Sequence, residues 1–389
     1  MIHFKSISSK IPAQTRCFKI EISYKTLRKC DKFLWLLISI ISLYGFLLVS
    51  SASRTGSRFF ESQVISVLMG IVLAFFGQFI NPRNLSRYWV FISIFCSGLM
   101  IYTLIFGSRV QGLAGVSAKA WILLPGGFNF QSSELAKIGF LFSFAKHLEI
   151  LKKKDKINDI KSLVYFGIHA LIPVILTHLQ GDDGAAIIFI CIILFELFIA
   201  GLDAKFFLIG LALFAISIPI IWNFGLAPYQ KNRILNMMNP ESDPYGMGFQ
   251  QLQGKISIGS GGFLGSGLFR GARVERGDVP VQASDFIFSV AGEELGFVGC
   301  FLVITLLLAL IFRIFYIAKS SKDYLGVFTC FGFIGLIASQ CIFNLGMCLS
   351  FLPVIGVILP FFSAGGSSVI CYYLGIGLIQ SIYISRNKD

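Results

Sequence analysis

Long apolar runs, separated by short polar segments, make up most of this chain. Runs of about 18–22 residues match the hydrocarbon core of a bilayer, which is roughly 30 Å thick. Such segments must be helical because lipid offers no partner to backbone amides and carbonyls. The pattern predicts ten spans, at residues 33–52, 63–80, 88–107, 131–148, 162–179, 185–201, 206–224, 286–312, 324–345 and 366–384.

A shorter apolar stretch, residues 351–362, contains Pro353 and Pro360. Proline removes a helical hydrogen bond and interrupts helices. We therefore expect this stretch to be re-entrant or interfacial and not a membrane span.

The composition agrees with the apolar pattern. The chain is 55% hydrophobic and 14% charged, with a mean hydropathy of +0.78. Soluble domains are about 45–50% apolar and about 25% charged. The predicted fold class is an all-α polytopic membrane protein, with about ten transmembrane helices and a long outer loop between spans seven and eight.

The distribution of Lys and Arg predicts the orientation. With the N-terminus inside, 22 of the 33 basic residues lie in inner segments, 10 lie in outer segments, and Lys137 lies within a span. Because basic residues favour the cytoplasmic side, both termini are expected to be cytoplasmic. The predicted parts are a tail at 1–32, a membrane domain at 33–385 with its outer loop at 225–285, and a C-terminus at 386–389.

The net charge of +13 needs no nucleic-acid partner. The predicted topology and anionic membrane lipid account for it, since basic residues flank the spans. Neither a disulfide framework nor a metal-ligand spacing is evident among the nine cysteines.

The outer loop 225–285 is long enough to carry structure and function of its own. The stretch "FQQLQGKISI" has helical spacing with an apolar stripe and is expected to lie on the membrane surface. The stretch "GSGGFLGSG" follows it. Amides exposed in such a turn can hold an oxyanion or a phosphate, and a purely structural loop is the alternative.

Three arginines follow at a spacing of three residues: Arg270, Arg273 and Arg276. Arginine binds phosphate by bidentate hydrogen bonds, so these residues are candidates for gripping a diphosphate. Binding to lipid headgroups is the alternative.

Asp285 stands where the outer loop enters the eighth span, in "VQASDFIFSVAGEELGFVG". One interpretation is an N-cap of that helix. The other is a general base, because partial desolvation raises the pKa of a carboxyl while a basic neighbour lowers it. Such a balance suits proton transfer from a hydroxyl group.

Glu293 and Glu294 lie eight and nine residues further on, within the span. Carboxylates inside a membrane are functional candidates by default, and a polar cavity wall is one role for them. A structural pairing with Lys137, Arg109 or Lys119 is the favoured alternative.

Other charged residues are expected at the same membrane face. Lys119 and Trp121 precede the fourth span, and Asp182 and Asp183 form the turn between spans five and six. Inside the fourth span, Glu134 and Lys137 are one helical turn apart and can pair with each other. An anionic, lipid-linked substrate would explain this gathering, and so would an ion pathway.

Taken together, these stretches resemble the SEDS family (shape, elongation, division and sporulation), which comprises the RodA and FtsW proteins. The similarity runs from about residue 33 to 385. The stretches that carry it are "FNFQSSELAK", "QGDDGAA", "NPESDPYGMGFQ", "IGSGG", "SDFIFSVAGEELGFVG" and "NLGMCLSFLPVIGVILPFFSAGGSS". "NPESDP" and "IGSGG" are closer to the RodA branch.

The resemblance implies a peptidoglycan glycosyltransferase that polymerises lipid II on the outer face of the bacterial cytoplasmic (inner) membrane. It places the family's essential aspartate at Asp285 and its outer-loop lysine and tryptophan at Lys119 and Trp121. Family members work with a class B penicillin-binding transpeptidase. A role in elongation and cell shape is expected, and a role in division is the alternative.

The chain also departs from the family pattern. The family's P-E-x-H-T-D is "PVQASD" at 280–285, which lacks the glutamate and the histidine. The family's G-K-G is "GSG" at 265–267, and its S-Y-G-G is "SAGG" at 363–366. The Q-P-D-L turn has lost its proline and has gained Asp183.

On this reading Asp285 deprotonates the 4-hydroxyl of the acceptor sugar, which attacks the anomeric carbon of the donor with inversion. Lys119, Arg270, Arg273 or glycine amides would stabilise the departing diphosphate. Asp182 and Glu294 are further candidates for substrate binding. The metal requirement is unknown, and a divalent cation (Mg²⁺ or Mn²⁺) held by Asp182 or Asp183 is an option.

Two other functions are consistent with the pattern. A lipid II flippase would use intramembrane charges and proline-broken segments without making a bond. A scaffold would recruit a transpeptidase and would not need Asp285.

Overall fold

The computed structural model describes residues 29–53, 59–111, 117–124, 128–238 and 248–386. Helices dominate these ranges. They are α2 (Lys32–Ala52), α3 (Phe59–Gly77), α4 (Pro82–Leu85), η1 (Ser86–Tyr88), α5 (Trp89–Phe106), α6 (Ser132–Lys153), α7 (Ile160–Leu179), α8 (Asp183–Ala200), α9 (Ala204–Ile220), η2 (Ile221–Gly225), α10 (Pro228–Met238), α11 (Phe249–Ser260), α12 (Ala272–Arg276), α13 (Ile287–Ser320), α14 (Tyr324–Cys348) and α15 (Gly366–Ser385).

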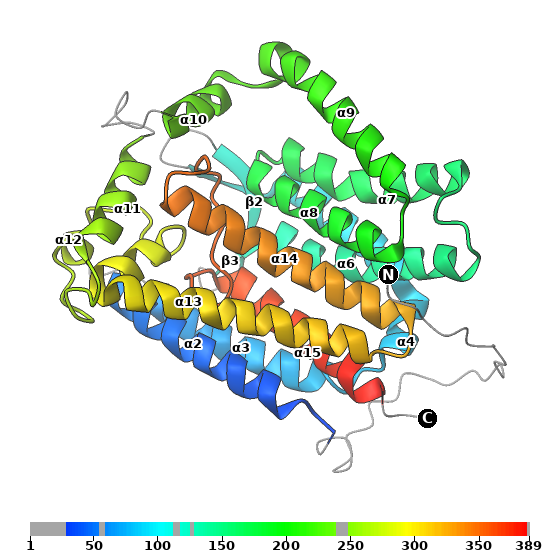
Figure 1. The fold of residues 1–389 in the computed structure, drawn as a ribbon, viewed down its shortest axis with the longest axis horizontal. Helices are drawn as coiled ribbons and strands as arrows, with labels where there is room; N and C mark the ends of the chain where they lie inside the picture. Colours follow the sequence, from blue (N-terminus) through cyan, green and yellow to red (C-terminus); the bar gives the residue numbers. More distant parts are fainter. Residues whose placement is uncertain (1–28, 54–58, 112–116, 125–127, 239–247, 387–389) are drawn as a thin grey trace.

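The predicted fold class is confirmed. Within the described ranges, nine helices are long and apolar enough to cross a membrane. The expected fourth span is α6, which is 22 residues long but carries buried Glu134 and Lys137. Helices α14 and α15 form the buried centre of the bundle, with α3 packed on α15 and α8 packed on α14 (Figure 1).

Short polar side chains fix several helix starts. Asp31, Asp182 and Asp323 stand at the N-caps of α2, α8 and α14, and each accepts a hydrogen bond from a backbone amide of the first turn. Such caps satisfy amides that have no helical partner. Helix α8 ends at Gly201, which adopts the left-handed conformation with φ of 86°.

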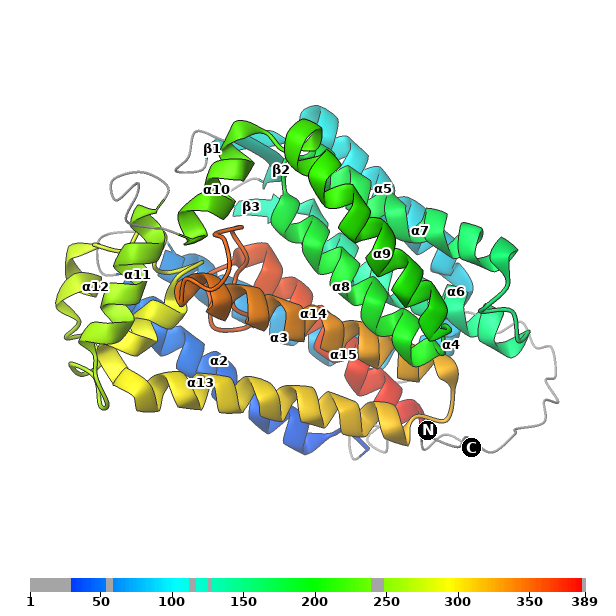
Figure 2. The same ribbon diagram turned by 45° about the horizontal axis from the view of Figure 1, so that its top comes forward.

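A small sheet was not predicted from the sequence. The strands β1 (Ser108–Gln111), β2 (Ser117–Leu124) and β3 (Phe128–Gln131) pair antiparallel in the order β1-β2-β3. They lie between α5 and α6, at the same end of the bundle as α10 (Figure 2). The alternation of apolar and polar residues in β3 is only four residues long, and β2 ends in the continuous apolar run "WILL", so the signal of a strand pair was weak.

Helix α9 stands apart from the bundle. None of its residues is buried. The end of α9 that precedes α10 lies away from α8, and α10 then leads toward α11 (Figure 1). The outer loop carries α10, α11 and α12. Helix α11 packs on α13 through Gly254 and Ser257, and its Gln251 donates to the Leu352 carbonyl, while Ile256 on the expected apolar stripe is exposed.

The segment 351–362 forms no helix. Phe351 is 75% exposed, whereas Phe361 and Phe362 are buried beside Gly45 of α2. The segment therefore enters the bundle from its surface, which agrees with the re-entrant alternative.

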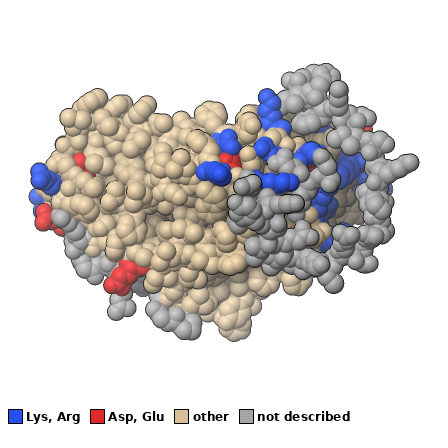
Figure 3. All heavy atoms as spheres, turned by 90° about the horizontal axis from the view of Figure 1, so that it is seen from below, with Lys and Arg blue, Asp and Glu red and all other residues tan. Residues whose placement is uncertain are grey.

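Charged side chains occupy the ends of the molecule on the face that Figure 3 shows. A broad, mostly uncharged area separates them, and Lys and Arg gather toward the end where α2 begins and α15 ends. This arrangement is typical of a membrane protein. The N-in, C-in topology and the tail at 1–32, most of which lies outside the described residues, stay predictions.

Candidate active site

Asp285 lies in a tight turn that ends the outer loop. The chain turns at Val281, which has a φ of 51°, and the amide of Asp285 donates to the Val281 carbonyl at 3.1 Å. Helix α13 begins at Ile287, and the residue at its N-cap is Phe286. The N-cap interpretation of Asp285 is therefore wrong, and its carboxylate is not used to start the helix.

The backbone around Asp285 is fixed by residues from much later in the chain. The side-chain amide of Asn344 on α14 donates to the carbonyls of Asp285 and Val357, each at 2.8 Å. The Ser363 hydroxyl donates to the Ser284 carbonyl at 2.5 Å. These bonds leave the Asp285 carboxylate available while holding its position.

The surroundings of the Asp285 carboxylate tune its basicity. One carboxylate oxygen of Asp285 faces Gly356, and a methyl carbon added at this glycine would lie 3.7 Å from that oxygen. Burial raises the pKa of Asp285 to about 6, although the Ser284 hydroxyl and the charge of Arg233 lower it. Desolvation disfavours the ionised form of a carboxyl, whereas a hydrogen bond and a cation favour it. A carboxylate with this pKa can accept a proton near neutral pH.

Arg233 was missed in the sequence. It lies on α10, partly buried, with its guanidinium 5.6 Å from the centre of the Tyr229 ring. The outer loop holds six basic residues, and spacing alone favoured the closely spaced Arg270, Arg273 and Arg276. The charge of Arg233 lowers the pKa of Asp285, although the two residues are more than fifty positions apart, so no local pattern could reveal this effect.

Two amides of the glycine-rich segment serve the fold and are not open to an anion. The amides of Ser266 and Gly267 donate to the carbonyls of Glu293 and Glu294, at 3.0 and 2.8 Å. Helix α13 is interrupted at Gly296, where φ is 64°, and these loop amides satisfy carbonyls at that interruption. The structural alternative is therefore the correct one for these two amides.

The carboxylates of Glu293 and Glu294 accept hydrogen bonds from residues that flank the glycine-rich segment and from α2. Glu293 accepts the Ser257 hydroxyl at 2.5 Å and the Arg273 amide at 2.7 Å. Glu294 accepts the Ser51 hydroxyl at 2.6 Å and the Gly271 amide at 3.3 Å.

Two of the three expected partners of these glutamates, Lys137 and Lys119, bind elsewhere. Lys137 pairs with Glu134 at 2.8 Å, and Lys119 donates to the Ile105 carbonyl at 2.5 Å. The side chain of Arg109 lies outside the described residues. Both glutamates are buried, so neither is described as the wall of an open cavity.

The three loop arginines differ in their freedom. Arg270 is exposed. Arg273 donates to Gln253 and lies 3.7 Å from Asp278, whereas Arg276 forms a 2.8 Å ion pair with Asp278. Arg276 lowers the pKa of Asp278 by hydrogen bonding and by its charge. Of the predicted phosphate ligands in this segment, Arg270 is therefore the freest.

Lys119, Trp121 and Asp182 come together at a second place. The Lys119 amide donates to the Gln180 carbonyl at 2.8 Å, and Trp121 pairs with Gln131 across the sheet. Gln131 in turn donates its side-chain amide to Asp182 at 2.7 Å. The sheet therefore places Lys119 and Trp121 beside the turn that starts α8.

The predicted site residues form two groups, with the segment 351–362 lying between Asp285 and α8. The Ile355 carbonyl oxygen lies so close to Gly184 that a methyl carbon added at this glycine would be 2.5 Å from that oxygen. The next residue, Gly356, faces Asp285. The Lys119, Trp121 and Asp182 group is on the α8 side. Arg270, Arg273 and Glu294 lie on the other side, along α13.

The carboxylates on the α8 side already have protein donors. Asp182 accepts the Ala185 amide at 3.0 Å in addition to Gln131, and Asp183 accepts His178 and Gln230. Across the described ranges, no group of three or more His, Cys, Asp and Glu side chains is placed to hold a metal ion. We derive no step that uses a metal.

The fold and the site define a class: a polytopic helical membrane protein with a partly buried carboxylate beneath its long outer loop. The family model described as "Cell cycle protein", which covers FtsW, RodA and SpoVE, matches residues 28–388. The chain belongs to this family, as the resemblance in the sequence predicted.

Several known proteins are similar to this chain. The peptidoglycan glycosyltransferase MrdB of Escherichia coli K12 is 32% identical over 92% of this chain and 94% of its own length. A probable peptidoglycan glycosyltransferase FtsW of Trichlorobacter lovleyi is also 32% identical, over 93% and 96%.

Solved structures agree with these relatives. A chain of a peptidoglycan synthase complex, studied for the coordination of polymerization and crosslinking, superposes with a TM-score of 0.79 at 30% identity, over 92% of this chain and 99% of that one. The rod shape determining protein RodA of Thermus thermophilus superposes with a TM-score of 0.69 at 28% identity, over 92% and 98%.

Proposed function

We propose that this chain is a RodA-like peptidoglycan glycosyltransferase that polymerises lipid II into β-1,4 glycan strands, with Asp285 as the general base. One observation carries the assignment of the base. Asp285 is a partly buried carboxylate whose backbone is fixed by Asn344, and whose oxygens are not committed to the helix that follows. The relatives named as glycosyltransferases support the reaction class.

The geometry supports an inverting displacement. Asp285 removes the proton of the acceptor hydroxyl, and the hydroxyl oxygen forms a bond to the anomeric carbon of the donor. The bond from that carbon to the lipid diphosphate breaks, and the diphosphate leaves with the bonding electrons. Arg233, whose charge already acts on Asp285, is one proposed cation for the charge that develops on the diphosphate.

Other residues keep their predicted roles within this proposal. Lys119, Trp121 and Asp182 would bind lipid II from the α8 side, and Arg270 and Arg273 would do so from the α13 side. Glu294 would act by holding the Gly271 amide. The described geometry gives Arg270 more freedom to reach a phosphate than Arg273.

The proposal includes a partner and a location. A class B penicillin-binding transpeptidase would cross-link the glycan, in line with the complex to which one similar structure belongs. The chain would lie in the cytoplasmic membrane with both termini inside and Asp285 at the outer face. Elongation and cell shape are its proposed role, because "NPESDP" and "IGSGG" are closer to the RodA branch.

The test is polymerisation of labelled lipid II by the purified chain and its transpeptidase partner in detergent. Detergent micelles have no compartments, so a flippase or a scaffold would leave lipid II unchanged. We expect glycan strands that a muramidase digests. A folded, partner-bound chain that forms no polymer would overturn the proposed function in favour of the flippase or the scaffold.

The pH dependence gives a second prediction. A general base works only when it is deprotonated, so kcat/KM should rise with pH through a midpoint near 6 and then level off. Below that pH the carboxyl is protonated and inactive, although a free aspartate with a pKa of about 3.9 would still be ionised. Initial rates between about pH 4.5 and pH 8 measure this limb. A flat profile down to pH 4.5 would contradict the assignment of the base.

A further inference from the structure

Asp183 is the residue by which this chain departs from the family's Q-P-D-L turn, and it links two elements. It is the first residue of α8, and its carboxylate is partly exposed. One carboxylate oxygen accepts a hydrogen bond from Nδ1 of His178 at 2.7 Å. The other accepts the side-chain amide of Gln230 on α10 at 2.5 Å.

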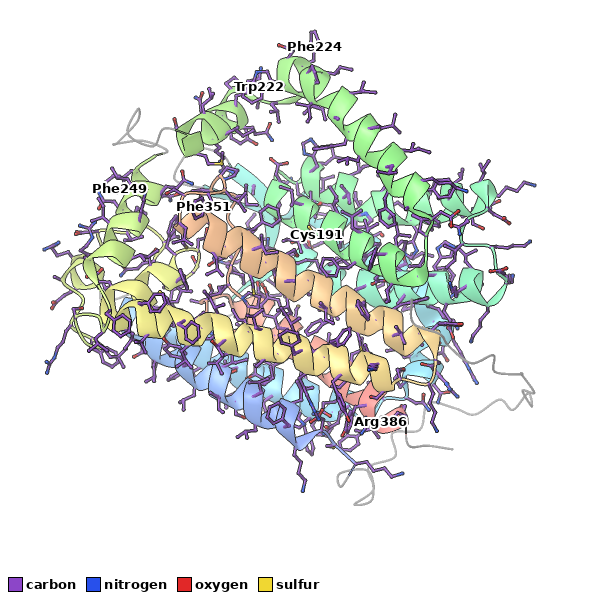
Figure 4. All side chains as sticks on the ribbon, viewed as in Figure 1. Cys191, Trp222, Phe224, Phe249, Phe351 and Arg386 are labelled. Carbon is purple, nitrogen blue, oxygen red and sulfur yellow. The ribbon has the colours of Figure 1, made fainter. Side chains whose placement is uncertain are left out.

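Gln230 is bound at both ends of its amide. While its nitrogen donates to Asp183, its oxygen accepts the Ala227 amide at 2.8 Å, at the start of α10. Between residues that the structure places, the bond to Asp183 is the one side-chain hydrogen bond that joins α10 to the helix bundle. The preceding helix α9 gives little support because it has no buried residue. Figure 4 shows Trp222 and Phe224, which connect the two helices, at the edge of the molecule.

The orientation of α10 matters because it carries Arg233. Residues three apart in a helix lie on the same face, so holding Gln230 also orients Arg233. The titratable groups that face the Asp183–Gln230 hydrogen bond are His178 from α7 and Tyr229 from α10. The charge of Asp183 raises the pKa of Tyr229, and the charge of Arg233 lowers it. The groups that act on Asp285 are Arg233 and Ser284.

We propose that Asp183 is a positioning residue, which holds α10, and with it Arg233, to the helix bundle through Gln230. This inference rests on the proposed function. The leucine of the family pattern has no acceptor for Gln230, so α10 of this chain gains an attachment that the pattern does not provide. The glutamate and histidine that the family has before its aspartate are absent here, and the charge of Arg233 acts on Asp285 in this chain.

The test compares Asp183→Leu with Asp183→Asn in the full chain bound to its partner. Asparagine keeps one acceptor oxygen for Gln230, whereas leucine keeps none. Hydrogen exchange of residues 228–238, which needs no substrate, reports the attachment directly. We expect hydrogen exchange of these residues to rise about tenfold in the leucine variant, because one charge-assisted hydrogen bond is lost. In the asparagine variant the exchange should stay near that of the wild type.

Kinetics test the positioning role. In Asp183→Leu we expect the KM for lipid II to rise and the pH midpoint of kcat/KM to move upward, because Arg233 no longer lowers the pKa of Asp285. Gln230→Leu should have the same effect, and the double variant should add nothing, as for partners in a single contact.

The outcomes separate the two proposals. Unchanged exchange in Asp183→Leu, or equal effects of leucine and asparagine, overturns the attachment. Raised exchange with an unchanged KM and pH midpoint overturns the positioning role. A wild-type chain that forms no glycan overturns the proposed function, and with it the positioning role, while the exchange result still decides the attachment.

Discussion

Replacement of Asp285 by asparagine is expected to slow glycan polymerisation by about 10²–10⁴-fold, the range that general base catalysis supplies. Asparagine has nearly the same shape but accepts no proton at neutral pH. The fold should be retained, because Asn344 binds the backbone carbonyl of residue 285 and not its carboxylate. Initial rates of polymer formation measure the effect, and thermal unfolding with the partner bound checks the fold.

Glu275→Gln is the matched control. Glu275 is an exposed carboxylate on α12 in the same outer loop, so its loss should leave the rate within about twofold, as for a surface substitution. If Asp285→Asn retained more than a tenth of the wild-type rate, the base would lie elsewhere. Asp182 and Glu294 would then be tested next.

Replacement of Lys137 by methionine is expected to lower the free energy of unfolding by about 3–5 kcal/mol, because it leaves a buried carboxylate without its partner. The Lys137 side chain is 2% exposed and that of Glu134 is 7% exposed, and their ion pair measures 2.8 Å. The second carboxylate oxygen of Glu134 has no donor. Thermal or denaturant unfolding in detergent measures the loss.

The double variant Glu134→Gln with Lys137→Met separates structure from transport. Because a buried ion pair adds little net stability over neutral residues of similar size, the double variant should recover most of the lost stability and polymerise lipid II. A stable double variant that forms no polymer would show that the pair takes part in the function, as an ion pathway would require.

Much of the fold could be predicted because lipid imposes a simple rule on sequence. Apolar runs of a fixed length must be helices, and all ten expected spans correspond to helices. The break of α13 at Gly296 could not be predicted. It depends on hydrogen bonds from Ser266 and Gly267, some thirty residues earlier, and glycine alone does not indicate which helices are interrupted.

The candidate site was predictable only where a single residue carried a local signal. Asp285 stood out as a carboxylate at the edge of an apolar run. Asn344 gave a weaker signal, as an amide within a span, and its bond to the Asp285 carbonyl follows only from the packing of α14. Lys119 and Arg273 were alternative candidates for stabilising the departing diphosphate, and the fold places them in separate groups on either side of the segment 351–362.

The contacts that fix Asp285 also order events during synthesis. Asn344, Ser363 and Ala364, which bind the backbone at 283–285, are made sixty to eighty residues after the turn that they hold. A nascent chain that has inserted α13 but has not yet made Ala364 therefore lacks part of the set of bonds that seat the base. The reaction centre is completed only after the segment between α14 and α15 has been made, so a shorter chain is not yet a catalyst.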